Sequence, residues 1–327
     1  MKIDVIGGSG FIGNKLCEIF EKEEIDYQIL DIAINPKYKT KTIHCDITNI
    51  KDLENNLSGD VVINLAAVHR DDVKPKSLYD EVNVEGSRNI CKVAITKNIK
   101  KIIFTSSVAV YGFAPKNTNE GGNTKPFNDY GRTKLEAEKI YQNWYETNDD
   151  LALTIIRPTV VFGEMNRGNV FNLFNQIRRP NFPMIGRGDN IKSMAYVDNL
   201  ADFVSYSINL KQGLHIYNYI DKPDLKIREL IEISRKSMNL RSKPIITVPY
   251  FLAIICGYIF DFLSFLLRKN FSISSIRIKK FCSDSQFNSS VSKTGFKPRY
   301  SLEDAIEKTV KYEFIDKKNE EITFISE

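Results

Sequence analysis

Tyr130 and Lys134 are the two residues of this sequence whose types and spacing most directly predict chemistry. Both belong to the stretch "DYGRTK", where they are four residues apart. On a helix this spacing brings both side chains to the same face, one turn apart. A tyrosine with an ordinary pKa of about 10 is a poor base at neutral pH, but a neighbouring ammonium lowers that pKa. The pair therefore predicts a general base, Tyr130, that Lys134 activates.

A hydroxyl that could assist this base comes from Ser107 in the stretch "FTSSVAVYG". The stretch ends an apolar run that we expect to be a central strand, and ligands bind at the carboxyl ends of such strands. Ser107 could hydrogen-bond the reacting oxygen there. Because a tyrosine and a lysine at this spacing also occur on ordinary amphipathic helices, the prediction depends on the motifs around them.

A glycine-rich turn, "VIGGSGFIG", joins the first apolar run to the first helical pattern. Its Gly7, Gly10 and Gly13 allow unusual dihedrals and the close approach of a pyrophosphate to the following helix. Asp31 stands 18 residues after Gly13, at the end of the second apolar run. A carboxylate there binds a ribose 2′-hydroxyl and repels a 2′-phosphate, so we expect NAD rather than NADP. Asp46, after the third run, is a candidate acceptor for the adenine amino group or an ordinary solvated side chain.

The elements that must position these residues alternate along the first 160 residues. Buried strands are predicted by short apolar runs, namely "KIDVIGG", "YQILDI", "TIHCD", "VVINLAA", "KIIFTSS" and "LALTIIRP". Helical patterns cover 13–22, 79–97 and 129–147. This alternation predicts an α/β fold with a Rossmann-type, doubly wound parallel sheet. We expect an NAD-binding domain at 1–162 with a return strand near 214–219, and a smaller, mainly helical substrate domain interleaved with it at 163–327.

The composition excludes several classes of protein. The 327 residues are 42% apolar and 27% charged, which argues against a disordered chain. The net charge of +5 is too small to predict nucleic-acid binding. Five cysteines without a C-x-x-C pair predict reduced thiols rather than a disulfide framework or a metal site. No secretory signal precedes the first apolar run, so we expect a cytosolic protein.

The chain resembles the extended short-chain dehydrogenase/reductases, and among them the NAD-dependent sugar epimerases and dehydratases. The similarity rests on "GGSGFIG", "NLAA", "NVEGSRNI", "SSVAVYG", "YGRTK", "RPTVVFG" and "YVDNLADFV". It implies that Tyr130 is the base, that Lys134 is its activator and a ribose ligand, and that Ser107 is the hydroxyl partner. It also implies that Ser106 supports this centre. The cofactor-binding residues that it implies are Gly7, Gly10, Phe11, Ile12, Gly13, Asp31, Asp46, Ile47, Leu65, Ala66, Ala67, Asn83, Tyr130 and Lys134.

Three departures from the family pattern narrow the activity. Dehydratases of this group usually carry Asp-Glu directly after the catalytic hydroxyl residue, where this chain has Val108 and Ala109. Nucleotide-sugar epimerases usually carry Asn where Val160 stands and Arg where Lys192 stands. Those residues serve the nucleotide diphosphate, so their absence disfavours a UDP-sugar substrate.

A closer similarity points to one subgroup, the bacterial 4-epimerases that act on N-acetylglucosaminyl-diphospho-undecaprenol. It rests on "AAVHRDDVKPKSLYDEVNVEG", "RPTVVFGEMNRGNV", "KSMAYVDN", "YNYIDKPDL", "KKFC" and "EITFISE". It implies interconversion of GlcNAc and GalNAc on a lipid-linked O-antigen precursor. Candidate substrate contacts are His69, Arg167, Asn169 and Lys192.

Other activities remain as alternatives to this interpretation. A UDP-sugar 4-epimerase and a 4-ketosugar reductase use the same base and cofactor. A non-catalytic NAD-binding scaffold belongs to another class, and the intact Ser107, Tyr130 and Lys134 argue against it. A homodimer is a candidate assembly.

Residues 248–269, "VPYFLAIICGYIFDFLSFLLRK", are unusually apolar for such a fold. We expect a helix over 249–268, and Asp261 near its centre disfavours a membrane span. The polar side of this helix would be a narrow stripe of Gly257, Asp261, Ser264 and Arg268.

Two locations suit such a helix. It could be a buried helix of the substrate domain, or it could lie in the interface of an anionic membrane. The second is favoured by five bases without an intervening acid, which are Arg268, Lys269, Arg277, Lys279 and Lys280. We therefore expect a peripheral protein on the cytoplasmic face of the inner membrane.

Overall fold

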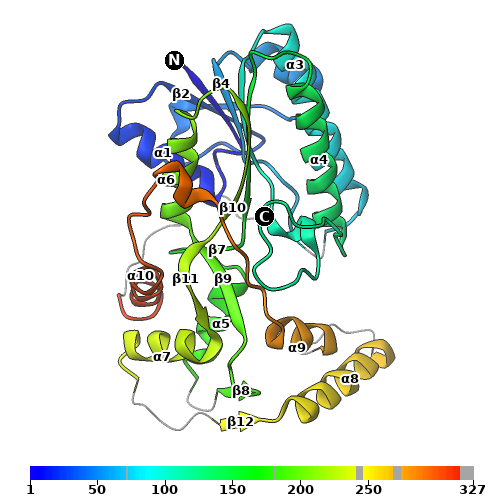
Figure 1. Ribbon diagram of the computed structural model, residues 1–327, viewed down its shortest axis with the longest axis vertical. Helices are drawn as coiled ribbons and strands as arrows, with labels where there is room; N and C mark the ends of the chain where they lie inside the picture. Colours follow the sequence, from blue (N-terminus) through cyan, green and yellow to red (C-terminus); the bar gives the residue numbers. More distant parts are fainter. Residues whose placement is uncertain (71–72, 180–181, 241–245, 268–273, 317–327) are drawn as a thin grey trace.

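A computed structural model describes residues 1–70, 73–179, 182–240, 246–267 and 274–316. The parallel sheet and its flanking helices form the upper half of the molecule in Figure 1, and a second group of helices and short strands forms the lower half. The expected Rossmann-type α/β fold is confirmed.

The central sheet has seven strands in the order β10-β6-β5-β4-β1-β2-β3, and all its neighbours are parallel. Helices cover both faces, so β1 and β4 are buried along their whole length and read as continuous apolar runs. The strands are β1 (Ile3–Ile6), β2 (Tyr27–Asp31), β3 (Thr42–His44), β4 (Val61–Asn64), β5 (Lys101–Thr105), β6 (Ala152–Pro158) and β10 (Gly213–Tyr219). The chain turns in opposite directions from β1, toward β2 on one side and β4 on the other, which creates a crevice where ligands bind in such sheets.

Two groups of helices pack on the two faces of this sheet. One face carries α1 (Phe11–Lys22) and α6 (Val197–Ser207), and the other carries α2 (Ile50–Asn56), α3 (Gly86–Thr96) and α4 (Asp129–Tyr145). The helix expected over 79–97 is divided into a π-helix, η2 (Tyr79–Glu85), and α3. Short 3₁₀ turns occur at η1 (Lys39–Lys41), η3 (Val108–Tyr111) and η4 (Val291–Thr294).

The lower half contains more strand than expected. A three-stranded sheet has the order β11-β9-β7, and a second pair joins β12 to β8. These strands are β7 (Val160–Phe162), β8 (Pro183–Ile185), β9 (Ile191–Tyr196), β11 (Asp221–Lys226) and β12 (Ile246–Val248). Its helices are α5 (Asn169–Ile177), α7 (Ile227–Ser237), α8 (Tyr250–Leu267), α9 (Ser275–Cys282) and α10 (Leu302–Phe314). Phe162, Phe174, Ile231 and Ile306 share the core of this half.

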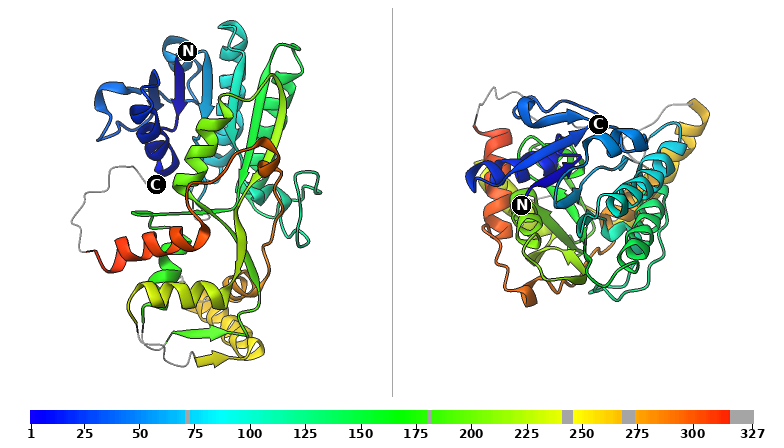
Figure 2. Two further views of the ribbon diagram at one scale, coloured as in Figure 1. Left: turned by 60° about the vertical axis from the view of Figure 1, so that its left-hand side comes forward. Right: turned by 90° about the horizontal axis from the view of Figure 1, so that it is seen from above.

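Helix α8 projects from the lower end of the molecule, and the two views of Figure 2 show it beyond the outline of the sheet. By length and composition it is apolar enough to cross a membrane, with a mean hydropathy of 2.0 and only 11% of its residues buried. The alternative of a buried helix is therefore wrong for the described structure, because α8 contacts α9 and leaves its apolar side exposed.

The polar stripe of α8 forms its contact with α9. A Cβ on Gly257 would lie 2.8 Å from Cα of Ser275, so the two backbones approach closely. The carboxylate of Asp261 accepts hydrogen bonds of 3.3 and 3.2 Å from the amide of Ser275, at the first turn of α9. The Asp261 carboxylate thereby has a hydrogen-bond donor, the Ser275 amide, within the pair of helices α8 and α9. Arg268 and Lys269 lie outside the described residues.

Candidate active site

The glycine-rich turn joins β1 to α1. Gly7 has φ +76°, in the left-handed region, and a Cβ there would lie 2.6 Å from the amide nitrogen of Ala66. A Cβ on Gly13 would lie 2.5 Å from Cα of Gly8, so α1 packs directly on the turn. Gly10 differs, since its Cβ would meet the carbonyl oxygen of Gly7 at 3.3 Å and nothing nearer. The outer side of Gly10 thus leaves room for a ligand at the amide groups that begin α1.

Asp31 ends β2 beside this turn. Its Oδ2 accepts a hydrogen bond from the amide of Ser9 at 3.0 Å, and its Oδ1 accepts one from the amide of Ala33 at 3.1 Å. A carboxylate can accept about four hydrogen bonds, so acceptor capacity remains for ribose hydroxyls. The open side of Gly10 and this carboxylate fit the pyrophosphate and the adenosine ribose of NAD.

Other predicted cofactor residues lie close to this edge of the sheet. Oδ1 of Asp46 accepts hydrogen bonds from the amide and the hydroxyl of Thr48 at 2.9 and 2.8 Å, which fixes the turn after β3. Ile47 is buried beneath that turn. Phe11 and Ile12, in the first turn of α1, are partly buried against the core of the lower half.

Asn83 holds the loop that follows β4. Its side-chain amide makes a reciprocal pair of 2.9 Å hydrogen bonds with the backbone of Val68, and its Nδ2 also donates to Oγ1 of Thr133 at 3.0 Å. Thr133 belongs to α4, so one buried side chain connects this loop to the helix of the expected base. The loop residues in between, Leu65, Ala66 and Ala67, are partly buried.

The first turn of α4 packs on the segment that follows Ser107. A Cβ on Gly131 would lie 2.5 Å from the carbonyl oxygen of Ala109. Ser107 caps η3, because its Oγ accepts a hydrogen bond from the amide of Ala109 at 3.1 Å. The Ser107 hydroxyl also lies near the Tyr130 phenol, where it acts to lower the pKa of that group. The structure thus brings together two predicted catalytic groups that are 23 residues apart in the sequence.

The surroundings of Tyr130 oppose its ionisation. Burial raises the pKa of the Tyr130 phenol above its ordinary value, and the nearby Ser107 hydroxyl acts in the opposite direction. A tyrosine in this environment needs positive charge beside it to reach the phenolate. Lys134 is the group that the helical spacing provides.

Lys134 lies one turn further along α4 and is 2% exposed. Its Nζ donates a 2.7 Å hydrogen bond to the carbonyl of Thr105, at the end of β5, and lies 4.6 Å from the centroid of the Phe104 ring. Burial lowers the pKa of Lys134 to about 7, while the charge of Glu138 acts in the opposite direction. The Lys134 ammonium is therefore easier to deprotonate than that of an exposed lysine.

Ser106 begins a buried polar network that the sequence analysis did not predict. Its hydroxyl donates to Oε1 of Glu138 at 2.5 Å. The two carboxylate oxygens of Glu138 accept hydrogen bonds of 2.8 and 2.6 Å from Nε and Nη2 of Arg157 on β6. Nη1 of Arg157 donates to the Tyr111 hydroxyl at 2.6 Å, and that hydroxyl donates to Asn218 at 2.8 Å. Ser106 thus connects the strand end to a rigid scaffold around the catalytic residues.

Two of the predicted substrate contacts, Arg167 and Asn169, lie at the N-terminal end of α5. Arg167 donates from Nη1 to Oε2 of Glu313 on α10 at 2.6 Å, and its guanidinium carbon lies 4.4 Å from the centroid of the Phe171 ring. Asn169 is exposed as the first residue of α5. The structure therefore turns the Arg167 side chain toward α10.

The other two predicted substrate contacts belong to different elements. His69 is exposed in the loop after β4. Lys192, on β9, donates from Nζ to the carbonyl of Ser283 at 2.6 Å. Burial lowers the pKa of Lys192 to about 8, and the nearby charge of Asp284 opposes this effect.

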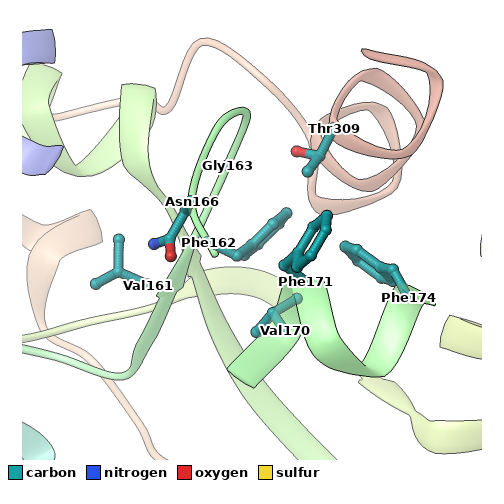
Figure 3. A pocket seen from close by; sticks show the side chains of 8 residues that line it. All are labelled: Val161, Phe162, Gly163, Asn166, Val170, Phe171, Phe174 and Thr309. Carbon is teal, nitrogen blue, oxygen red and sulfur yellow. The ribbon is translucent and has the colours of Figure 1, made fainter. Parts of the chain in front are cut away.

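A small apolar pocket lies under the loop that carries Arg167. Figure 3 shows the rings of Phe162 and Phe171 at this pocket, with Thr309 of α10 beside them. Its lining residues come from β7, α5, α10 and the loop between β7 and α5. None of them belongs to the glycine turn or to α4, so this pocket is separate from the residues that surround Tyr130.

The sheet, the glycine turn and the Ser107–Tyr130 contact define a dinucleotide-dependent enzyme of the short-chain dehydrogenase/reductase type. The profile of the NAD dependent epimerase/dehydratase family matches residues 3–219, and the chain belongs to this family. NAD is its cofactor.

Curated relatives extend the similarity over the whole chain. The N-acetyl-alpha-D-glucosaminyl-diphospho-ditrans,octacis-undecaprenol 4-epimerase of Escherichia coli O157:H7 is 43% identical over 99% of this chain and 98% of its own. A decarboxylating sterol-4-alpha-carboxylate 3-dehydrogenase of Candida albicans is 27% identical over 94% of this chain and 95% of its own.

Solved structures show the same fold at low identity. The UDP-N-acetylglucosamine 4-epimerase of Bacillus cereus superposes with a TM-score of 0.74 at 20% identity, over 95% of this chain and 98% of that one. The UDP-glucuronic acid 4-epimerase of the same organism, solved with NAD, has a TM-score of 0.71 at 21% identity and the same coverage.

Proposed function

We propose that the protein is a 4-epimerase that interconverts GlcNAc and GalNAc on a diphospho-undecaprenol carrier, a step in O-antigen precursor synthesis. The relative that is named for this activity is 43% identical over almost the full length of both chains. The observation that carries the proposal beyond similarity is the exposed apolar helix α8, which a water-soluble sugar nucleotide would not require.

The catalytic residues perform proton transfers in this reaction. Tyr130 takes the proton of the C4 hydroxyl at its Oη, and the Ser107 hydroxyl holds the same sugar oxygen. The charge of Lys134 stabilises the phenolate. Bound NAD would supply the hydride acceptor and donor for C4, so no external reductant would be consumed.

Inversion at C4 requires that the sugar turn while its diphosphate stays anchored. Tyr130 then returns the proton to the C4 oxygen after the opposite face of the ring has been presented. Lys192 is the proposed anchor for a phosphate, acting as a point charge where relatives of the family use arginine.

The proposed location is the cytoplasmic face of the inner membrane, with α8 in the membrane interface. The exposed side of α8 includes Phe262, Phe265 and Leu266, which are 64%, 83% and 64% exposed. Arg277 and Lys279 of the neighbouring α9 are also exposed and suit anionic headgroups. Such a location brings the enzyme to a substrate whose lipid stays in the bilayer.

The test offers the purified protein two substrates, UDP-GlcNAc and the lipid-linked GlcNAc diphosphate, and analyses the sugar released by acid. GalNAc from the lipid-linked substrate is the expected result. If GalNAc is formed from UDP-GlcNAc and not from the lipid-linked substrate, the protein is a UDP-sugar epimerase. A steady change of absorbance at 340 nm with added cofactor would instead identify a reductase.

A further inference from the structure

Five phenylalanine side chains are exposed among the residues that the structure describes, and they occur in two places. Three belong to α8, and the other two are Phe113 and Phe127. The Phe113 and Phe127 rings stack, with centroids 4.6 Å apart and 26° between their planes. They remain 68% and 47% exposed despite this contact. We call this stacked pair the aromatic platform.

The aromatic platform belongs to the two chain segments that also carry catalytic residues. Phe113 comes six residues after Ser107, directly beyond η3. Phe127 comes three residues before Tyr130, next to the residue that caps α4. The two segments are therefore those that carry the hydroxyl partner and the base.

A close backbone contact brings the two segments together. Gly112 has φ +64°, and a Cβ on it would lie 2.0 Å from the carbonyl oxygen of Lys125. No other residue type could adopt this conformation at this distance without displacing the chain. This contact fixes the backbone positions from which the two rings of the aromatic platform extend.

The same loop is bound to the segment that follows α9. Lys116 forms a 2.9 Å ion pair with Asp284, and the amide of Asn117 donates to the carbonyl of Gln286 at 2.9 Å. Thr118 continues this pairing as an isolated bridge to Phe287. Since α9 packs on α8, a series of contacts connects this loop to the apolar helix.

We propose that the aromatic platform binds the isoprenoid chain of a polyprenyl diphosphate sugar, close to its diphosphate. The inference rests on the lipid-linked substrate proposed above and adds the site for its lipid. Phenylalanine has no hydrogen-bonding group, so the two exposed rings offer a partner apolar surface rather than polar contacts. An isoprenoid that covers them removes apolar surface from water, which favours binding. The rest of the chain would then extend toward α8 and the bilayer.

The test compares two GlcNAc diphosphates, one esterified with the long polyprenyl chain in detergent micelles and one esterified with methyl. We expect Phe113→Ser/Phe127→Ser to raise KM for the polyprenyl substrate about tenfold with kcat nearly unchanged, because binding energy common to ground and transition state is lost. KM for the methyl ester and the affinity for NAD should stay at wild-type values. Leu214→Ser/Ile315→Ser, a change of two other exposed apolar residues, is the matched control and should alter neither KM.

Each other outcome overturns the inference. An equal rise of KM for both substrates would show that the platform contacts the sugar or its diphosphate. An unchanged KM for the polyprenyl substrate would show that the isoprenoid lies elsewhere. If the wild type converts neither the polyprenyl ester nor the methyl ester, the proposed function itself is wrong, and this result needs no variant.

A second variant tests whether apolar area is what the platform supplies. Phe113→Leu/Phe127→Leu keeps most of that area and should recover most of the affinity that the serine variant loses.

Discussion

Lys134 and Glu138 occupy successive turns of the same face of α4, both at most 2% exposed, with the charge of Glu138 opposing the effect of burial on the Lys134 ammonium. An ammonium and a carboxylate are thus both held in the interior next to the reacting centre. Burying charged groups costs stability, so these residues are expected to serve catalysis at the expense of the folded state.

The first prediction concerns Lys134→Met. The pKa of Lys134 is about 7 in the folded protein and about 10.4 in an unfolded chain. Between these two pH values the unfolded chain binds more protons than the folded protein, so the contribution of Lys134 to the free energy of unfolding rises with pH. Below pH 7 the burial of the charged lysine destabilises the folded protein by its full amount. In NAD-free protein, Lys134→Met should therefore raise the free energy of unfolding by about 1–3 kcal/mol at pH 6. The gain should shrink steadily up to pH 10, as measured by urea unfolding. A constant gain would mean that Lys134 is already neutral at pH 6.

The second prediction concerns the buried pair of Glu138 and Arg157, whose side chains are 1% and 5% exposed. Arg157→Met leaves the Glu138 carboxylate without its charged partner and should lower the free energy of unfolding by about 3–5 kcal/mol. Arg88→Met, which removes an exposed ion pair with Glu85, is the matched control and should cost about 1 kcal/mol or less. Similar losses in both variants, measured by denaturant titration, would contradict the structural role of the buried pair.

The third prediction concerns the base. Tyr130→Phe keeps the ring and removes the proton acceptor, so epimerisation should fall about 10³-fold while NAD affinity and the melting temperature stay close to wild type. Tyr145→Phe, at the other end of α4, should retain full activity. Sugar analysis of the product after timed incubation gives both rates. Substantial turnover by Tyr130→Phe would assign the base to another residue.

The fourth prediction concerns cofactor choice. The wild type should bind NAD far more tightly than NADP, because the Asp31 carboxylate repels a 2′-phosphate. Asp31→Ser should weaken NAD binding and reduce the difference in affinity between NAD and NADP, as measured by calorimetry. The matched control is Asp26→Ser, which changes the residue directly before the first residue of β2. This variant should keep the wild-type preference for NAD. Equal affinities of the wild type for NAD and NADP are the result that excludes this role for Asp31.

The fifth prediction concerns α8. The wild type should float with anionic liposomes more strongly at low salt than at high salt, because headgroup attraction is screened. Phe262→Ser/Phe265→Ser/Leu266→Ser should reduce flotation and leave NAD affinity unchanged. Ile95→Ser, which removes an exposed apolar side chain from α3, should float like the wild type. A wild type that stays in solution at low salt would exclude a membrane role for α8.

Local patterns were sufficient for the parts of the site that lie on one element. The strand, glycine turn and helix of 3–22 follow each other directly, and the spacing of Tyr130 and Lys134 is a property of a single helix. The apolar run of α8 also showed its length and its polar stripe. The neighbour that this stripe contacts could not be predicted from the sequence, because α9 is a separate helix.

The missed parts depend on partners that are distant in sequence. Glu138 and Arg157 are 19 residues apart on a helix and a strand, and no sequence pattern pairs the one with the other among 41 acidic and 46 basic residues. Glu120 accepts hydrogen bonds from the amide of Ser290, 170 residues away. The position of Glu138 four residues after Lys134 was the one available signal, since it implies a third polar group on the same face of α4.

The seventh strand of the central sheet has a consequence for biosynthesis. β10 pairs with β6 over seven residues, from Gly213↔Ala152 to Tyr219↔Pro158, yet some fifty residues, most of them in the lower half, separate the two strands in the chain. A nascent chain that ends before β10 exposes the edge of β6, which is a template for pairing with other chains. The upper half should therefore become protease-resistant on the ribosome only after residue 219 has left the exit tunnel, and a fragment that stops at 162 should aggregate.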